Sequence, residues 1–168
     1  METTRVRFIL LVEDNPADVK IMQRALAQAA SRVELAVVHD GQEAVDYLLR
    51  QGPYACPEQA RPAGADDKGG PTERPVWCRP DLVILDLNLP RLTGIDVLKK
   101  IRAVDHLCLT PVVVLSTSRS LDDVRDAYVA GANTYVEKPG EYDRFVEMLR
   151  TILQFWLEIA VLPPTPAG

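Results

Sequence analysis

Hydrophobic residues along this chain form short uninterrupted runs, and between the runs they recur every three or four positions. The runs lie at residues 8–12, 82–85 and 112–115, with less regular examples at 33–38 and 134–136. Uninterrupted runs of this length are typical of strands that are buried on both faces of a parallel sheet. We therefore predict five strands.

Helical spacing fills the intervals between these strands. Asn15, Asp40 and Thr93 carry side-chain oxygens that can cap the first three helices. Asp18 stands three positions after Asn15, which is the capping-box position, although Asp is shorter than the usual Glu. These residues predict helices that begin directly after the first, second and third strands.

Two more helices complete the pattern, one at about residues 121–130 before Gly131 and a long one at about 141–160. Strict strand–helix alternation predicts a parallel sheet with helices on both faces. Five such units fit an α/β, flavodoxin-like doubly wound (βα)5 fold with strand order 2-1-3-4-5.

The segment 52–80 interrupts the alternation because it is rich in proline and glycine and has little periodicity. Loops beyond ~12–15 residues are uncommon in compact domains and are usually functional or disordered. We interpret the segment as an insertion between the second helix and the third strand. It is either a mobile loop or a lid or docking surface anchored by Trp77. We assign residues 1–160 to one domain and 161–168 to a proline-rich tail, with no output domain after it.

Composition and charge narrow the function. The net charge of −5 argues against a protein that binds bulk nucleic acid. The sequence shows no apolar run long enough to span a membrane and no secretory signal pattern. We therefore expect a cytoplasmic protein that binds neither nucleic acid nor membrane.

Polar side chains follow four of the predicted strands at the point where each ends. Glu13 and Asp14 follow the first strand, Asp86 the third, Ser116 the fourth and Lys138 the fifth. Ligands of open α/β sheets bind beyond the carboxyl ends of the strands. We therefore expect these side chains to converge on one rim of the sheet.

Three carboxylates held together repel one another and stay ionised only beside a cation. Oxygen ligands favour a hard ion, Mg²⁺ above all. Lys138 could neutralise the remaining charge or pair with one carboxylate. A phosphate oxygen can complete such a metal site, so the cluster favours phosphoryl chemistry with one carboxylate as a candidate nucleophile.

These residues, in this order, resemble the receiver domain of bacterial two-component response regulators. The likeness covers about residues 5–157, apart from the insertion. Within the family the chain is similar to single-domain regulators that work with bacterial phytochromes, to judge from residues 113–120 and 155–157. The matching motifs are Glu13-Asp14, Asp86-Leu87-Asn88-Leu89-Pro90 followed by Gly94, Ser116-Thr117 and Lys138-Pro139.

The resemblance implies a role for each matching acid. Asp86 corresponds to the phosphoacceptor, Asp14 to the direct metal ligand and Glu13 to the second acid of the metal site. Asn88 would supply its backbone carbonyl to the metal. The implied cofactor is Mg²⁺, and the implied phosphoryl donor is a sensor histidine kinase, with a bacteriophytochrome as one candidate.

The resemblance also implies how the signal leaves the site. Ser116 takes the place of the switch hydroxyl, and Thr117 that of the small residue after it. Lys138 corresponds to the lysine that contacts the phosphoryl group, and Tyr135 to the switch aromatic. The protein would catalyse only its own phosphotransfer and autodephosphorylation, and its output would run through a partner or a dimer.

Two other functions compete with this interpretation. A metabolic phosphohydrolase with an aspartyl intermediate usually has an acid two residues after the nucleophile, but Asn88 stands there. A degenerate receiver that serves only as a scaffold is disfavoured by the intact acid set.

The predicted last helix carries more hydrophobic surface than one sheet face requires, because a single stripe roughly 100° wide is enough. One stripe comprises Phe145, Met148, Ile152, Phe155 or Trp156, and Ile159, and the other comprises Val146, Leu149, Leu153, Leu157 and Val161. A wide face that covers the sheet edge is one explanation. We favour a homodimer packed through this helix, with members of the second stripe such as Leu153 and Leu157 exposed.

Overall fold

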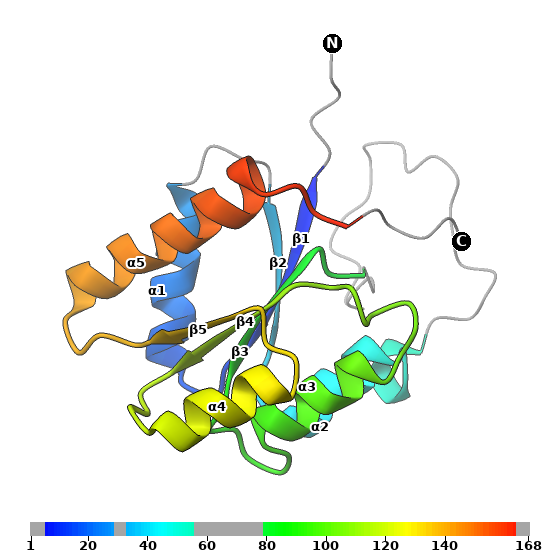
Figure 1. Cartoon of the computed structure of the whole chain (residues 1–168). Coiled ribbons are helices and arrows are strands. Elements are labelled where there is room, and N and C mark those ends of the chain that lie inside the picture. Colours follow the sequence, from blue (N-terminus) through cyan, green and yellow to red (C-terminus); the bar gives the residue numbers. More distant parts are fainter. Residues whose placement is uncertain (1–5, 29–32, 56–78, 164–168) are drawn as a thin grey trace, which may run out of the picture.

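A single sheet of five parallel strands, in the order β2-β1-β3-β4-β5, runs through the centre of the molecule (Figure 1). The structure is a computed structural model and describes residues 6–28, 33–55 and 79–163. The observed order confirms the predicted doubly wound topology. The strands are β1 (Arg7–Val12), β2 (Val33–Val38), β3 (Leu82–Asp86), β4 (Val112–Ser116) and β5 (Thr134–Glu137).

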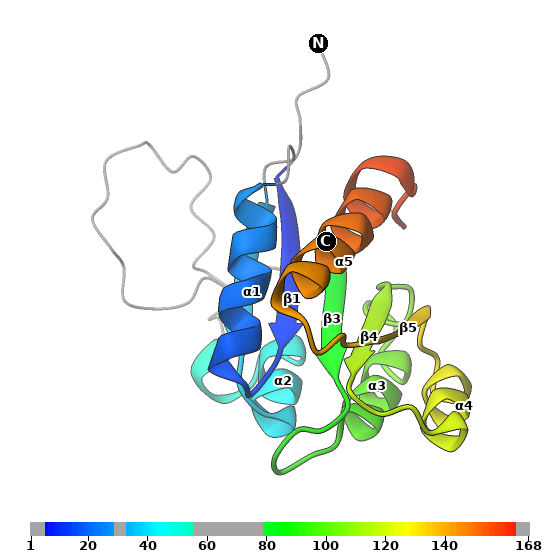
Figure 2. The same cartoon turned by 90° about the vertical axis from the view of Figure 1, so that its left-hand side faces the viewer.

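Helices cover both faces of the sheet. Figure 2 shows α1 and α5 on one side of the strands and α2, α3 and α4 on the other. The helices are α1 (Pro16–Ala27), α2 (Gly41–Leu48), α3 (Gly94–Arg102), α4 (Leu121–Val129) and α5 (Tyr142–Gln154), with short helical turns η1 (Gly52–Tyr54) and η2 (Phe155–Ile159).

Alternate residues of each central strand enter different cores. Ile9 and Leu11 of β1 pack in the cluster beneath α1 and α5, whereas Leu10 and Val12 pack in the cluster beneath α2 and α3. Every residue of β3 and of β4 is buried. Because both faces of the sheet are covered, the strands need apolar side chains on both, which explains their uninterrupted hydrophobic runs.

The predicted helix caps are present. The Asn15 side chain accepts a hydrogen bond from Ala17 N, at 2.9 Å. Asp40 accepts one from Glu43 N at 2.8 Å, and Thr93 accepts one from the third residue of α3. The caps fix where α1, α2 and α3 begin, and thus how the loops leave the strand ends.

The last helix is not the continuous α-helix predicted for residues 141–160. The α-helical geometry ends at Gln154, and η2 is π-helical, with Ala160 N donating to Phe155 O at 2.7 Å. The wider turn keeps Leu157 buried, four positions after Leu153, while Trp156 also packs against the core. Packing of this end on the sheet thus accompanies the departure from α-helical geometry.

The prediction that Leu153 and Leu157 of the second hydrophobic stripe are exposed is wrong, since both are buried. The four members of this stripe within the helix lie in the same core as β1 and β3, because this stripe is the one that faces the sheet. They are Val146, Leu149, Leu153 and Leu157. Val161, the last member of this stripe, lies beyond η2 and is 98% exposed, and the exposed stripe residues within the helix belong to the first stripe at its far end, where Phe155 is 48% and Ile159 65% exposed.

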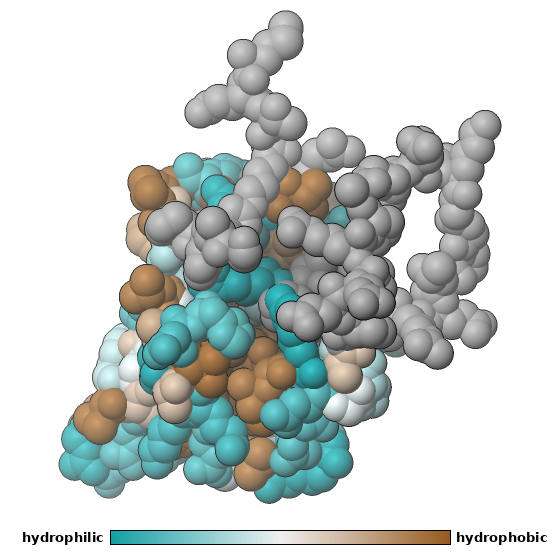
Figure 3. Space-filling view, turned by 90° about the vertical axis from the view of Figure 1, so that its right-hand side faces the viewer, coloured by the Kyte–Doolittle hydropathy of each residue, from teal (hydrophilic) through white to brown (hydrophobic). Residues whose placement is uncertain are grey.

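Most of the predicted insertion, residues 56–78 with Trp77, lies outside the described residues, and so do residues 164–168 of the tail. No helix within 6–28, 33–55 or 79–163 combines the length and the apolar character needed to cross a membrane. On the face drawn in Figure 3, hydrophobic residues appear as small separate patches among hydrophilic ones.

Burial predicts that two truncations at the end of the last helix differ in their effect on the free energy of unfolding. Leu153→Ala should lower the free energy of unfolding by about 2–5 kcal/mol, because it empties a buried position. Ile159→Ala, at a position that is exposed in the single chain, should change the free energy of unfolding of the monomer by no more than about 0.5 kcal/mol. Urea unfolding followed by circular dichroism measures both, and equal effects would contradict the observed packing.

Candidate functional site

The carboxyl ends of the strands bring the predicted acids together. Glu13 and Asp14 follow β1, and Asp86 ends β3. One carboxylate oxygen from each of the three lies within 4.8 Å of the others. Glu13 and Asp86 are buried, whereas Asp14 is exposed. The site therefore has two acids held in the protein and one at its mouth.

The Lys138 ammonium lies among the carboxylates. Its Nζ donates to Glu13 Oε2 at 2.6 Å, to Asp86 Oδ2 at 2.7 Å and to Asp18 Oδ2 at 2.9 Å. An ammonium has three N–H donors, so every donor of this buried lysine has a carboxylate partner. The sequence allowed for one such ion pair, and the structure contains three.

The pKa values of the buried groups reflect this pairing. Burial alone would lower the pKa of Lys138, but hydrogen bonds to Asp86 and Glu13 hold it above its ordinary value. Burial raises the pKa of Glu13, although the hydrogen bond from Lys138 opposes that shift. Lys138 is thus firmly cationic, and its hydrogen bond favours the ionised form of Glu13 against the effect of burial.

The surroundings of Asp86 fix the direction of its carboxylate. Asn88 N donates to Asp86 Oδ1 at 3.0 Å, while Lys138 holds Oδ2. Gly94, the first residue of α3, lies so close that a Cβ there would collide with the Asp86 carbonyl oxygen. The strand end that carries Asp86 is therefore closely packed against the start of α3.

A second close backbone contact lies beside the one at Gly94. A Cβ on Gly41, the first residue of α2, would collide with the backbone of Leu92 in the loop after β3. The guanidinium of Arg91 in the same loop pairs with Asp40, the residue that caps α2. The loop after Asp86 is thus fastened to both α2 and α3.

The residues assigned to the switch lie on the other side of Asp86. Ser116 is fully buried at the end of β4, and its Oγ accepts a hydrogen bond from Ser118 N at 3.1 Å. Tyr135 lies outside the acid cluster, but its hydroxyl donates to Ser118 O at 2.9 Å. Tyr135 N donates to the hydroxyl of Tyr128 on α4. Tyr135 therefore connects β5 to the loop after β4 and to α4.

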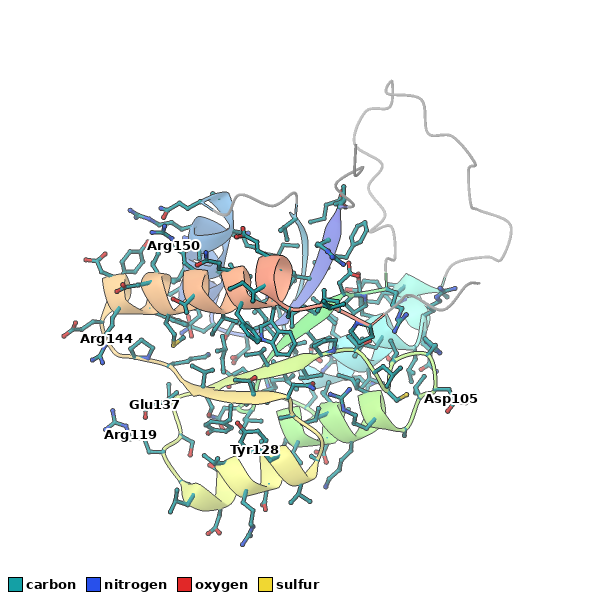
Figure 4. All side chains as sticks on the ribbon, turned by 45° about the horizontal axis from the view of Figure 1, so that its top comes forward. Asp105, Arg119, Tyr128, Glu137, Arg144 and Arg150 are labelled. Carbon is teal, nitrogen blue, oxygen red and sulfur yellow. The ribbon has the colours of Figure 1, made fainter. Side chains whose placement is uncertain are left out.

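An exposed ion pair lies on this side of the site, between the loop after β4 and the end of β5. Arg119 and Glu137 point toward each other next to β5 (Figure 4), and Arg119 Nε donates to Glu137 Oε1 at 2.6 Å. Tyr128 lies between α4 and β5 in the same view. The hydrogen bond of the Tyr135 hydroxyl and this exposed ion pair therefore link the loop after β4 to β5, next to the backbone hydrogen bond from Lys138 N to Ser116 O at 2.8 Å.

Asp18 is the site residue that the sequence did not identify. The capping-box position predicts that its carboxylate turns back to the N–H of Asn15, but Glu13 Oε1 accepts that hydrogen bond at 3.1 Å. The Asp18 carboxylate contacts Lys138 instead, because a buried ammonium attracts it more strongly than an amide. The sequence does contain a signal for the position of Asp18. A helix that begins directly after Asp14 must place its first turn, and so Asp18, beside the same rim of the sheet.

His39, the residue after β2, lies at the edge of the site. Its Nδ1 is 3.2 Å from the backbone oxygen of Glu13. The backbone N–H of His39 donates to Glu43 Oε2 at 2.7 Å. These contacts connect the end of β2 to the backbone after β1 and to the first turn of α2.

The donor set fits a divalent metal. All three clustered side chains offer oxygen, which is the ligand type that hard cations prefer. The carboxylates outnumber the single ammonium, so negative charge remains to attract a cation. Glu13, Asp14 and Asp86 are the side chains that could hold it.

Comparison with known proteins identifies the class. The family of response regulator receiver domains matches residues 73–150. The response regulator Rcp1 of Synechocystis sp. is 35% identical over 162 residues, which cover 96% of this chain and 97% of Rcp1. The chain therefore belongs to the response regulator receiver family, as its motifs predict.

Solved structures of particular family members are similar to this chain over most of its length. The phosphorylated cyanobacterial phytochrome response regulator RcpA has a TM-score of 0.80 at 38% identity, covering 95% of this chain and 100% of that one. The Mn²⁺-bound form of Rcp1 has a TM-score of 0.78 at 35% identity, covering 94% and 99%. A probable methanogenesis regulatory protein, FilR2 of Methanothrix harundinacea, is 35% identical over 150 residues, covering 89% of this chain and 83% of FilR2.

The exposed acid of the cluster can be tested separately from the buried ones. Asp14→Ala should weaken Mg²⁺ binding roughly tenfold or more, because it removes a ligand but leaves the contacts of Lys138 intact. Stability in EDTA should not fall, because the substitution also relieves repulsion between carboxylates. Calorimetric titration and thermal melting measure the two effects.

A matched control is Asp105→Ala, which removes an exposed acid on the opposite side of the molecule from Glu137 (Figure 4). It should leave Mg²⁺ binding unchanged. An Asp14→Ala protein that binds Mg²⁺ like the wild type would contradict the assignment of Asp14 as a ligand.

Proposed function

We propose that the protein is the phosphoacceptor of a two-component signalling system, with Asp86 as the residue that takes the phosphoryl group. One observation carries the proposal. The buried Asp86 carboxylate lies 2.7 Å from the ammonium of Lys138, inside a cluster of acids at the end of the central strand. The relative RcpA, whose structure is that of a phosphorylated protein, supports it.

The chain's own groups prepare Asp86 for this reaction. A carboxylate oxygen of Asp86 attacks the phosphorus of a phosphohistidine, so that a P–O bond forms, the P–N bond breaks and the histidine ring leaves. Asn88 N and Lys138 Nζ hold the carboxylate in place before the attack. Lys138 then offers N–H donors to the phosphoryl oxygens.

Mg²⁺ is the cofactor that we propose for this site. Asp14 and Asp86, with Glu13 and the backbone carbonyl of Asn88, would hold it. When bound, the ion supplies positive charge that shields the phosphoryl oxygens from the surrounding carboxylates. The Mn²⁺-bound form of Rcp1 supports a divalent ion at this type of site.

Phosphorylation would act on the side of the site where Ser116 and Lys138 lie. A phosphoryl group adds charge and acceptor oxygens, which attract the Ser116 hydroxyl and the Lys138 ammonium. The loop after Ser116 accepts the hydrogen bond of the Tyr135 hydroxyl. A shift of this loop would therefore reach α4, β5 and α5, whose exposed surface would present the output.

The chemistry argues for a signalling protein rather than a metabolic enzyme. Asn88 cannot protonate a leaving group, so we propose only self-catalysed phosphotransfer and autodephosphorylation. Turnover of a small phosphomonoester would instead support a phosphohydrolase. The partner that we propose is a sensor histidine kinase, and the phytochrome association printed for RcpA makes a bacteriophytochrome the first candidate.

The phosphoacceptor assignment is tested by Asp86→Asn, which is nearly isosteric but cannot form an acyl phosphate. After incubation with acetyl phosphate and Mg²⁺, the intact mass of the wild type should increase by one phosphoryl group and that of the variant should not. Equal uptake by the two proteins would show that another residue accepts the phosphate. Failure of both to be labelled would support the scaffold alternative.

We also propose a homodimer through the last helix, with a contact surface different from the one that the stripes suggested. Phe155 and Ile159 are exposed on η2, and the Phe155 ring packs edge-on against Trp156 with centroids 5.3 Å apart. Exposed aromatic and branched side chains on one short turn are typical of a contact that a second copy covers.

The double substitution Phe155→Glu with Ile159→Glu should give a monomer that still accepts phosphate at Asp86, since neither side chain lies in the core. Light scattering at micromolar concentration, before and after phosphorylation, measures the state. Arg150→Glu, on the exposed side of α5, is a control for added negative charge on the same helix. A wild type that is monomeric in both conditions would rule out the homodimer.

A further inference from the structure

Asp18 provides the third partner of the Lys138 ammonium. Its Oδ2 lies 2.9 Å from Nζ, and the contact joins the first turn of α1 to the end of β5. The side chain of Lys138 is 4% exposed and that of Asp18 is 18% exposed. Both line a hollow of about 240 Å³ between α1 and the start of α5, together with Thr117 and Tyr142. The contact therefore lies at the open side of the site.

We propose that Asp18 is a positioning residue for phosphoryl transfer, which holds one N–H of Lys138 and gives it up to the phosphoryl group on Asp86. The proposal rests on the function proposed for Asp86. It assigns to Asp18 a role in setting both the divalent metal affinity and the rate of phosphorylation.

The argument begins with the number of donors. Lys138 has three N–H groups, and each already has a carboxylate partner. A phosphoryl oxygen can gain an N–H from Lys138 only if one carboxylate loses its own. Three partners therefore compete for that exchange.

Exposure and distance decide which partner is released. Glu13 and Asp86 are almost fully buried and have the shorter contacts with Nζ, at 2.6 and 2.7 Å. A buried carboxylate that loses its cation is costly, because water cannot replace the lost partner. Asp18 has the longest contact and the most exposed side chain, so water can hydrate it after release.

Removing the Asp18 charge should move two quantities in opposite directions. In Asp18→Asn, Lys138 would hold Glu13 and Asp86 more strongly and the site would be less negative, so the affinity for Mg²⁺ should fall about threefold to tenfold. At saturating Mg²⁺, labelling by acetyl phosphate should become about threefold to tenfold faster, because no carboxylate competes with the anionic phosphoryl group. A merely structural role would lower both quantities together.

Two further variants sharpen the test. Asp18→Glu keeps the charge on the same turn and should keep the Mg²⁺ affinity within about twofold of the wild type. Asp143→Asn removes an exposed acid from the first turn of α5, so it matches the loss of a helix-terminal charge. This control should change neither quantity.

The experiment combines calorimetric Mg²⁺ titration with the time course of acetyl-phosphate labelling, read by intact mass at saturating Mg²⁺. Weaker metal binding with faster labelling in Asp18→Asn alone supports the proposal. Any other pattern in Asp18→Asn, such as unchanged values, a change in only one quantity or a fall in both, overturns it. The function of Asp86 still stands in that case if the wild type is labelled. A wild type that takes up no phosphate at Asp86 overturns both.

Discussion

The site depends on one buried cation, the ammonium of Lys138. Burial of a charge is costly unless partners of opposite charge surround it, and removal of one partner from such a pair typically costs about 3–5 kcal/mol. Here the partners come from three different places in the chain, at the end of β1, in the first turn of α1 and at the end of β3. A single side chain after β5 therefore links α1 to three strands of the sheet and places a positive charge among the acids of the site.

Much of the fold could be predicted because burial leaves a direct trace in sequence. The strands are covered on both faces, so β3 and β4 appear as unbroken apolar runs. Asn15, Asp40 and Thr93 act as caps because cap contacts are local and need no knowledge of the rest of the molecule. The convergence of the acids could also be predicted, since parallel strands in one sheet place their carboxyl ends on the same rim.

What could not be predicted depends on which of two partners a group meets in three dimensions. Asp18 has a local partner in the cap and a distant one in Lys138, and only the folded distance decides between them. The last helix carries two hydrophobic stripes, and sequence alone does not say which one faces the sheet. The buried positions of Leu153 and Leu157 settle that choice, and the π-helical turn that accompanies it has no local signature in the sequence.

The close contacts of Gly94 with Asp86 and of Gly41 with Leu92 make one side of the rim stiffer than the other. Toward α2 and α3, backbone lies against backbone at Gly94 and Gly41, so displacement there would mean overlap of atoms that have no freedom to rotate away. Toward α4, the connections at Ser118 and Arg119 are hydrogen bonds and an exposed ion pair, which can exchange partners with water. We therefore expect a chemical change at Asp86 to displace the loop after β4 more readily than the closely packed backbone toward α2 and α3, so the asymmetry of the rim gives the response a direction.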